Sequence, residues 1–333
     1  MPKVMALGDV NIDIIAHFDA FPPQGVDAFS ESLLFQCGGA AANTARALAS
    51  MGVETGLIAR VGSDPWSSQA VDGLARVGVL LDSLQVDNDV MTGLMFVIVT
   101  PDGDRTLIGC RGANARTDPR QIREEEIQSA RVLHLSGYAL LTEPQREAAL
   151  LAIEIARRHG LVITLDPGVG VSAAALDAMR ACFPAVQILL PNLHEAQRLS
   201  GAHAPEICAR ALMDAGVKSV ALKLGAAGCL IGSPEGLFRV PGFAIAARDS
   251  TGAGDSFGAG VIAGFLGGLD WRSTAVLGNA LGALAASGGG AGAMPPTPPD
   301  VLAFLRQQID LPAYRPWRDA VAQAVAFVHS LGE

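Results

Sequence analysis

The sequence contains few charged residues, and its basic residues are outnumbered by acidic ones. Charged side chains make up 17% of the 333 residues, and 24 Lys and Arg stand against 33 Asp and Glu, which leaves a net charge of −9. Proteins that bind nucleic acid hold its phosphate backbone with clustered Lys and Arg, so this composition argues against nucleic acid as a partner. Any anionic ligand must instead be bound at a local site that is built without a basic surface.

Closely spaced cysteines and long apolar runs are also missing. The five cysteines lie far apart and form no C-x-x-C pair or Cys/His cluster at zinc spacing, so we expect reduced, buried thiols in a cytoplasmic protein. The longest apolar run covers residues 256–269, and its 14 residues are too few to cross a bilayer. The first residues carry no secretory signal pattern. We therefore expect no membrane partner.

Hydrophobic residues and glycine are abundant. Hydrophobic residues make up 50% of the chain, and 38 positions are glycine. Such a composition is typical of a globular protein with a large core. Short β-branched or Leu-rich runs, for example at residues 4–7, 57–61 and 162–166, alternate with Ala-rich helical patterns. This alternation predicts an α/β fold with a mostly parallel sheet and helices on both faces. Charge-poor helices are predicted at about residues 253–266 and 273–287.

Two stretches, at about residues 14–36 and 93–111, interrupt this alternation because they lack a helical period. The second holds two apolar runs around Pro101-Asp102-Gly103-Asp104, which is a strong hairpin signal. We interpret both stretches as strands of a small β-sheet lid inserted into a single domain of residues 1–333. The proline-rich segment 293–299 is expected to be non-helical throughout, and a helical tail to follow at about residues 312–333.

The most informative segment is Asp249-Ser250-Thr251-Gly252-Ala253-Gly254-Asp255, which precedes an apolar helical pattern. Small residues let a ligand approach the backbone, and the free N–H groups at the start of a helix bind an anion without Lys or Arg. A carboxylate at Asp255 would lie in the first helical turn, where it could deprotonate a hydroxyl beside a bound phosphate. The same residues also fit a capped core helix with no ligand.

Two further segments have polar residues where a ligand could bind. Gly38-Gly39 precedes a predicted helix and places Asn43 about one turn into it, where its amide can bond to hydroxyl groups. Gly8-Asp9-x-Asn11-x-Asp13 follows the first predicted strand, at the edge where open α/β sheets bind ligands. Each segment also fits an ordinary turn.

Gly38-Gly39-x-x-x-Asn43 and Asp249-Ser250-Thr251-Gly252-Ala253-Gly254-Asp255 resemble the paired signatures of the pfkB-type carbohydrate kinases, in the ribokinase-like superfamily. The resemblance extends to about residue 310 and includes Asn192-x-x-Glu195 and Gly225-x-x-Gly228. It implies a ribokinase-like three-layer α/β/α fold with a β-sheet lid. It also implies transfer of the γ-phosphoryl group of ATP to a hydroxymethyl oxygen of a sugar or nucleoside.

The resemblance implies a role for each matching residue. Asp255 would be the catalytic base, and the N–H groups of Gly252, Ala253 and Gly254 would stabilise the charge on the transferred phosphoryl group. Asn192 and Glu195 would order Mg²⁺ and its waters, with Glu195 holding the metal through water. Capping or a solvated helix face is the alternative for Asn192, Glu195 and Asn279. The sugar would be contacted by Asn11, Asp13, Gly38, Gly39 and Asn43, and the nucleotide by Asn192, Lys223, Gly225, Gly228 and, at the adenine, Asn279.

Ribokinase-like relatives carry a monovalent cation site, which here would use Asp249, the carbonyl of Thr251 and a loop at about residues 285–294. This loop ends in Met294, which has no hydroxyl group, although backbone carbonyls can still coordinate potassium. The resemblance therefore leaves activation by K⁺ open. The role of the run Gly288–Gly290 in this loop also stays open.

The residues that decide the sugar do not agree with one group of relatives. Ribokinases carry a Lys after Gly38-Gly39, which this chain lacks, and Ala41-Ala42-Asn43-Thr44-Ala45 looks like the nucleoside kinases. Arg111 falls where 2-keto-3-deoxygluconate kinases bind the substrate carboxylate, but it also fits an exposed hairpin charge. We favour a ribose-like sugar with a primary hydroxyl, with 2-keto-3-deoxygluconate kinase, fructokinase and nucleoside kinase as alternatives. Lid strands of this kind also imply a homodimer.

Other classes of protein fit the sequence less well. Two Rossmann-like glycine matches, at residues 168–173 and 288–293, leave a dinucleotide-dependent oxidoreductase as an alternative, although the second runs into prolines. No G-x-x-x-x-G-K-[ST] motif is present, which excludes a P-loop kinase. A sugar sensor without catalysis is a further alternative, against which the intact Asp255 argues.

Overall fold

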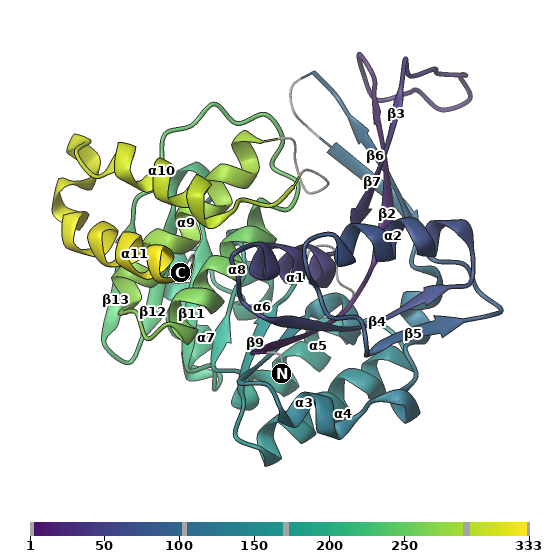
Figure 1. Ribbon diagram of the computed structural model, residues 1–333, viewed down its shortest axis with the longest axis horizontal. Coiled ribbons are helices and arrows are strands. Elements are labelled where there is room, and N and C mark those ends of the chain that lie inside the picture. The colour runs from purple at the N-terminus through teal and green to yellow at the C-terminus, as the bar shows by residue number, and fades with distance from the viewer. Residues whose placement is uncertain (1–2, 102–104, 169–172, 289–293, 332–333) are drawn as a thin grey trace.

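The fold is built on one large sheet and one small sheet, as the computed structural model shows for residues 3–101, 105–168, 173–288 and 294–331 (Figure 1). The large sheet has nine strands in the order β13-β12-β11-β10-β9-β8-β1-β4-β5. Neighbouring strands run parallel except at β11/β12 and β12/β13. Its strands are β1 (Val4–Leu7), β4 (Thr55–Gly62), β5 (Leu84–Asp87), β8 (Val132–Ser136), β9 (Val162–Asp166), β10 (Ile188–Leu189), β11 (Ser219–Lys223), β12 (Cys229–Ser233) and β13 (Gly236–Val240).

Helices cover both faces of this sheet, which confirms the predicted α/β fold. Alternate residues of β1 show the two faces: Met5 and Leu7 pack in one core cluster, and Val4 and Ala6 pack in two others. Helices α3 to α7 border the first cluster, whereas α1, α2 and α8 to α11 lie on the other side. The helices are α1 (Ala40–Ser50), α2 (Pro65–Ala75), α3 (Glu124–Gln128), α4 (Gln145–Arg158), α5 (Ala173–Cys182), α6 (Leu193–Ser200), α7 (Pro205–Asp214), α8 (Ala253–Leu266), α9 (Trp271–Ser287), α10 (Pro298–Gln308) and α11 (Arg318–Leu331).

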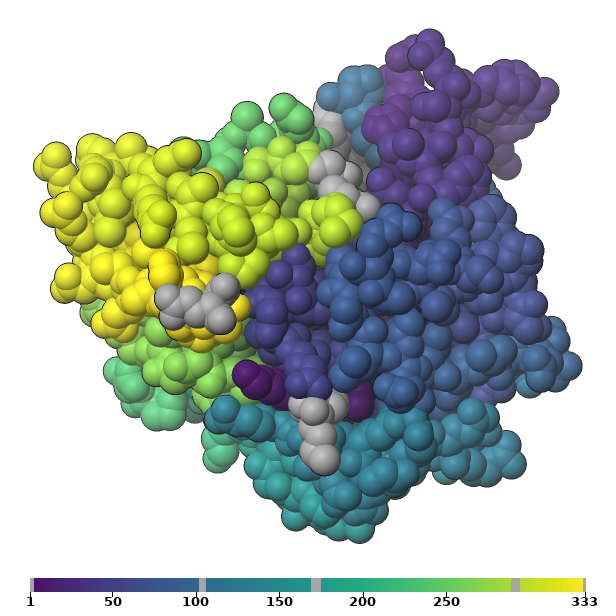
Figure 2. All heavy atoms as spheres, in the orientation of Figure 1, coloured from purple at the N-terminus to yellow at the C-terminus, as the bar shows by residue number. Residues whose placement is uncertain are grey.

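The small sheet forms a lid that projects from the body of the protein (Figures 1 and 2). Its strand order is β3-β2-β6-β7, with β2 (Asn11–His17), β3 (Leu33–Gly38), β6 (Gly93–Val99) and β7 (Arg105–Cys110). The inserted lid is therefore confirmed, although its first strand begins at Asn11 and not near residue 14. The predicted turn residues Asp102, Gly103 and Asp104 lie outside the described residues.

Short 3₁₀ helices and a C-terminal helical tail complete the fold. The expectation that residues 293–299 are all non-helical is wrong, because Pro298 and Pro299 open α10. Proline is tolerated in the first turn of a helix, where its missing N–H would have no intrahelical partner. No helix in the described part of the chain is both long and apolar enough to span a membrane. The 3₁₀ helices are η1 (Gly112–Arg116), η2 (Pro119–Gln121), η3 (Gly137–Leu140), η4 (Phe183–Ala185), η5 (Gly225–Ala227) and η6 (Pro312–Trp317).

Candidate active site

Helix α8 begins as the small residues before it predict. Its N-cap, Gly252, has a φ of 74°, a left-handed conformation that favours glycine. The loop before it is held by Asp249, whose Oδ1 accepts hydrogen bonds from the N–H and Oγ1 of Thr251 at 2.8 and 2.6 Å. The first intrahelical bond runs from the Ser256 N–H to the Gly252 carbonyl. The N–H groups of residues 253–255 therefore precede the helical ladder, although that of Ala253 donates to the Ser250 carbonyl at 3.2 Å.

The two signature segments meet at this helix start. Asn43, in the first turn of α1, donates from Nδ2 to Oδ2 of Asp255 at 2.9 Å, across 212 residues of sequence. Asp255 lies in the first turn of α8 and is half-buried. The hydrogen bond orients this carboxylate at the positive end of a 14-residue helix. A carboxylate that is oriented but still accessible can accept a proton from a bound hydroxyl group.

Polar residues also gather at the root of the lid, where β2 pairs with the end of β3 just before α1. Asp13 lies directly against Gly38, where an added methyl group would stand 2.1 Å from Oδ2. Asn11 is fixed by buried Asn114, whose Oδ1 accepts from the Val10 N–H at 2.9 Å and whose Nδ2 donates to Oδ1 of Asn11 at 2.8 Å. Because Oδ1 of Asn11 already accepts this hydrogen bond, Nδ2 of Asn11 is the group that can donate to a ligand.

Arg111 links the lid to the large sheet. Its Nε and Nη2 donate to the two carboxylate oxygens of Asp9 at 3.0 and 2.8 Å. Gln145 donates to the same carboxylate at 2.9 Å and also accepts from Arg111. The guanidinium side chain is 18% exposed, so it is not the exposed hairpin charge of the alternative interpretation. The sequence places Arg111 near the sugar but gives no sign of its pairing with Asp9.

A cavity of about 550 Å³ lies against the first turn of α8. It brings together six residues to which the family resemblance gives a role at the nucleotide or the anion site. Apolar side chains and glycines supply most of its remaining wall, and Lys223 is its only charged residue among those described. The six residues are Lys223, Gly225, Gly228, Asn279, Ala253 and Gly254, and Phe243 and Phe257 are among the others.

Lys223 forms a buried ion pair below this cavity. Its Nζ donates to Oδ2 of Asp166 at 2.7 Å, and the two side chains are 15% and 9% exposed. Burial alone would lower the pKa of Lys223, but the negative charges of Asp166 and Glu195 raise it above its ordinary value. Lys223 is therefore charged near the start of α8, where a methyl group on Gly254 would stand 3.4 Å from Nζ. The sequence did not single out Asp166, because a carboxylate at a strand end has no distinguishing spacing.

Asn192 and Glu195 form a capping box at the start of α6. Glu195 accepts from the N–H and Nδ2 of Asn192, both at 2.8 Å, and returns a bond from its own N–H at 2.9 Å. The capping alternative is thus present, but it does not exclude Mg²⁺, because the carboxylate oxygens retain lone pairs for metal-bound water. Burial raises the pKa of Glu195 to about 7, while Lys223 opposes this rise.

Asn279 lies in the wall of the large cavity, whereas part of the predicted cation loop lies outside the described residues. Asn279, on α9, donates from Nδ2 to the Pro241 carbonyl at 3.0 Å and lines the large cavity. Residues 289–293 of the predicted cation loop, which include Gly289 and Gly290, lie outside the described residues. Parts of both Rossmann-like matches, residues 169–172 and 289–293, lie outside them as well. No cluster of three or more His, Cys, Asp or Glu that could hold a metal ion occurs in the described ranges.

Comparisons with known proteins agree with this arrangement. The model of the pfkB family of carbohydrate kinases matches residues 1–298. The ATP-dependent ribose-1-phosphate kinase of Halopiger xanaduensis is 32% identical over 93% of this chain and all of its own length, and the ribokinase of Haemophilus influenzae is 27% identical over 90% and 97%. A structure from E. coli, provisionally described as a ribokinase II in complex with ATP and Mg²⁺, aligns with a TM-score of 0.83 at 26% identity, covering 92% of this chain and all of the other. A family model that covers most of the chain, together with the meeting of both signatures at α8, shows that this protein belongs to the pfkB family of carbohydrate kinases.

Proposed function

We propose that the protein transfers the γ-phosphoryl group of ATP to a primary hydroxyl of a ribose-like sugar, with Asp255 as the catalytic base. The hydrogen bond between Asn43 and Asp255 is the observation that carries this proposal. Asn43 lies in the helix that directly follows lid strand β3, and Asp255 lies in the helical turn whose residues Ala253 and Gly254 line the same cavity as Lys223. A sugar on one side and a triphosphate on the other would meet at the start of α8.

In the proposed reaction, the oxygen of the acceptor hydroxyl forms a bond to the γ-phosphorus. Asp255 accepts the proton that this hydroxyl loses. The bond from that phosphorus to the β,γ-bridging oxygen breaks, and ADP leaves. The N–H groups at the start of α8 stabilise the charge on the transferred group, and Lys223 offers a cation to the phosphates. Asn11 and Asp13 orient the acceptor from the lid.

Magnesium, when bound, neutralises charge on the nucleotide phosphates. Glu195 and Asn192 would hold it through water, as the family resemblance implies, and Glu195 lies close enough to Lys223 for their charges to interact. Hard oxygen ligands and retained water are what Mg²⁺ prefers. For potassium, we propose only the Asp249–Thr251 loop as its place, supported by the family resemblance. The assay below therefore compares potassium with sodium.

The pairing of Arg111 supports an uncharged sugar over a sugar acid. Its guanidinium is engaged by both oxygens of Asp9, so the positive charge expected for a substrate carboxylate is already neutralised. This observation favours ribose over 2-keto-3-deoxygluconate. Because the Halopiger relative is a ribose-1-phosphate kinase, phosphorylated ribose is included among the candidates.

An acceptor screen tests the proposed function. ADP release would be measured with MgATP and ribose, ribose 1-phosphate, fructose, 2-keto-3-deoxygluconate, adenosine or inosine, in potassium and in sodium buffer. We expect the highest kcat/KM with ribose, with the new phosphate ester on the primary hydroxyl by phosphorus NMR. A higher value with another acceptor would replace ribose by that acceptor. ADP release with none of them would favour the sensor.

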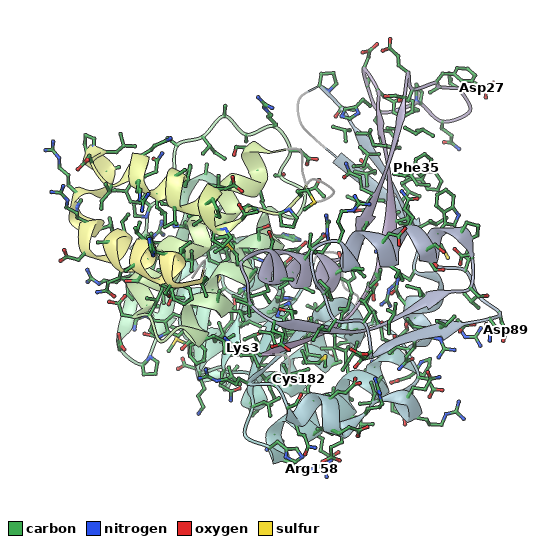
Figure 3. The ribbon with its side chains drawn as sticks, in the orientation of Figure 1. Lys3, Asp27, Phe35, Asp89, Arg158 and Cys182 are labelled. Carbon is green, nitrogen blue, oxygen red and sulfur yellow. The ribbon has the colours of Figure 1, made fainter. Side chains whose placement is uncertain are left out.

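We also propose a homodimer through the lid. Phe35, Ile14, Phe96 and Ile108 lie opposite one another across β3, β2, β6 and β7 on one face of the small sheet. Phe35, labelled in Figure 3, stacks on Trp66 of α2, but Phe96 and Ile108 are 50% and 54% exposed. An apolar row of this kind suits a second copy of the lid.

Sedimentation equilibrium tests the dimer. At micromolar concentration we expect about twice the 34.3 kDa chain mass, and Phe96→Ser with Ile108→Ser should shift it to the monomer. A wild-type monomer at this concentration would contradict the proposal.

A cytoplasmic location is proposed too, supported by five cysteines that are all free.

A further inference from the structure

The C-terminal tail packs against a wall of the nucleotide cavity. The family model ends at residue 298, so α10, η6 and α11 lie almost entirely beyond it. These elements, yellow in Figures 1 and 2, cover α9 and join its core cluster. Phe243, which lines the cavity, belongs to the same cluster.

Tyr314 makes the most direct of these contacts. The side chain, in η6, is 1% exposed, and its hydroxyl donates to the Pro241 carbonyl at 2.7 Å. Its ring stacks on Phe243 with the centroids 4.3 Å apart and the planes 10° from parallel. Burial raises the pKa of Tyr314 further above its ordinary value, so the hydroxyl stays protonated and remains a donor.

The segment that Tyr314 holds is also held from the cavity side. The Pro241 carbonyl accepts a second hydrogen bond, from Nδ2 of Asn279 at 3.0 Å. Phe304 of α10 packs edge-on against Phe243, with centroids 5.0 Å apart. Two tail residues and one residue of α9 thus fix residues 241–243 at the place where Asn279 and Phe243 line the cavity.

We propose that Tyr314 is a positioning residue for the base of the bound nucleotide. Tyr314 does not line the cavity itself. It acts through its hydrogen bond to Pro241 and its stacking on Phe243. The proposal rests on the proposed function, in which this cavity takes ATP. It assigns to the tail a role in holding a planar aromatic base, as distinct from the triphosphate, which Lys223 and the start of α8 would meet.

Replacement of the tyrosine separates this role from a merely structural one. Tyr314→Phe keeps the stacking and removes one hydrogen bond, so we expect the Kd and KM for ATP to rise about fivefold. Tyr314→Leu removes the stacking as well, and we expect about thirtyfold. The KM for the sugar, kcat at saturating ATP and the inhibition constant of inorganic tripolyphosphate, which has no base, should change less than about twofold.

The matched control is Val321→Ala, which truncates a fully buried tail residue of α11 away from the cavity wall. It should lower the melting temperature and leave the Kd for ATP unchanged. If wild-type protein binds ATP and Tyr314→Phe and Phe304→Leu both bind it equally well, the proposal is overturned. If wild-type protein binds no ATP, the proposed function fails instead. If inhibition by tripolyphosphate weakened as much as ATP binding, the proposal that Tyr314 positions the nucleotide base would also be overturned.

Discussion

Replacing Asp255 with Asn should lower kcat by about a thousandfold or more, while the Kd for ATP and for the sugar changes little. The amide oxygen of Asn can still accept the hydrogen bond from Asn43, which lies 2.9 Å from the carboxylate in the wild-type protein. The substitution therefore preserves the local geometry and removes only the ability to take a proton. Single-turnover kinetics with the best acceptor, together with calorimetric binding, measure the two effects separately.

Asp270→Asn is the matched control for this experiment. Asp270 caps α9 by accepting from the Ser273 N–H at 2.7 Å, so it is also a carboxylate at a helix start, but it lies outside the site. Because Asn caps a helix about as well as Asp, the substitution should change stability by less than about 0.5 kcal/mol and leave kcat unchanged. Near-normal turnover by the Asp255→Asn variant would show that another group takes the proton.

Replacing Lys223 with Met should raise the KM for ATP about a hundredfold and lower the free energy of unfolding by about 3 kcal/mol. The variant leaves the Asp166 carboxylate buried without its partner at 2.7 Å. It also removes the only charged side chain among the described residues that line the large cavity. Both losses have the same cause, because one ammonium group serves the ion pair and the phosphates.

A second substitution separates the two effects. With Asp166→Asn added, the carboxylate that lost its ion-pair partner is removed, so most of the lost stability should return while the KM for ATP stays high. Arg239→Met is the control, because it removes an ion pair whose side chains are 53% and 43% exposed. It should change stability by less than about 0.5 kcal/mol. A double variant that recovers its affinity for ATP would place Lys223 outside nucleotide binding. Denaturant unfolding and steady-state kinetics supply both readouts.

The sequence predicts much of the fold because many elements have a clear local pattern. Helix α8 begins and ends as expected, at Ala253 and Leu266, because small residues precede it and the run that follows is almost wholly apolar. Strand β2 was harder, since both of its faces are buried and polar Asn11 and Asp13 lie on one of them. Their burial depends on contacts with the rest of the fold, which a period-two pattern does not reveal.

The site shows the same division between local and distant information. Asn43 and Asp255 each stand in a recognisable segment, but only the fold brings them together across 212 residues. Asp9 was named only as part of a polar segment, and Asn114 and Asp166 were assigned no role, because each of the three pairs with a residue 57 to 104 positions away. Such pairings depend on the order of strands in the two sheets, and the spacing of residues along the chain does not encode it.

The junction between β1 and β2 connects the large sheet to the lid sheet, and so connects the two sides of the proposed site. Only Gly8, Asp9 and Val10 separate a strand of the large sheet from a strand of the lid, and Arg111 and Asn114 tie this short connection to the other root of the lid. Asn11 and Asp13 therefore belong to the lid sheet, whereas Asp255 and Asn43 belong to helices that pack on the large sheet. In the proposed reaction, the distance from the bound acceptor to Asp255 depends on the angle between the two sheets, so we expect a substitution that loosens this junction to lower turnover without touching a reacting group.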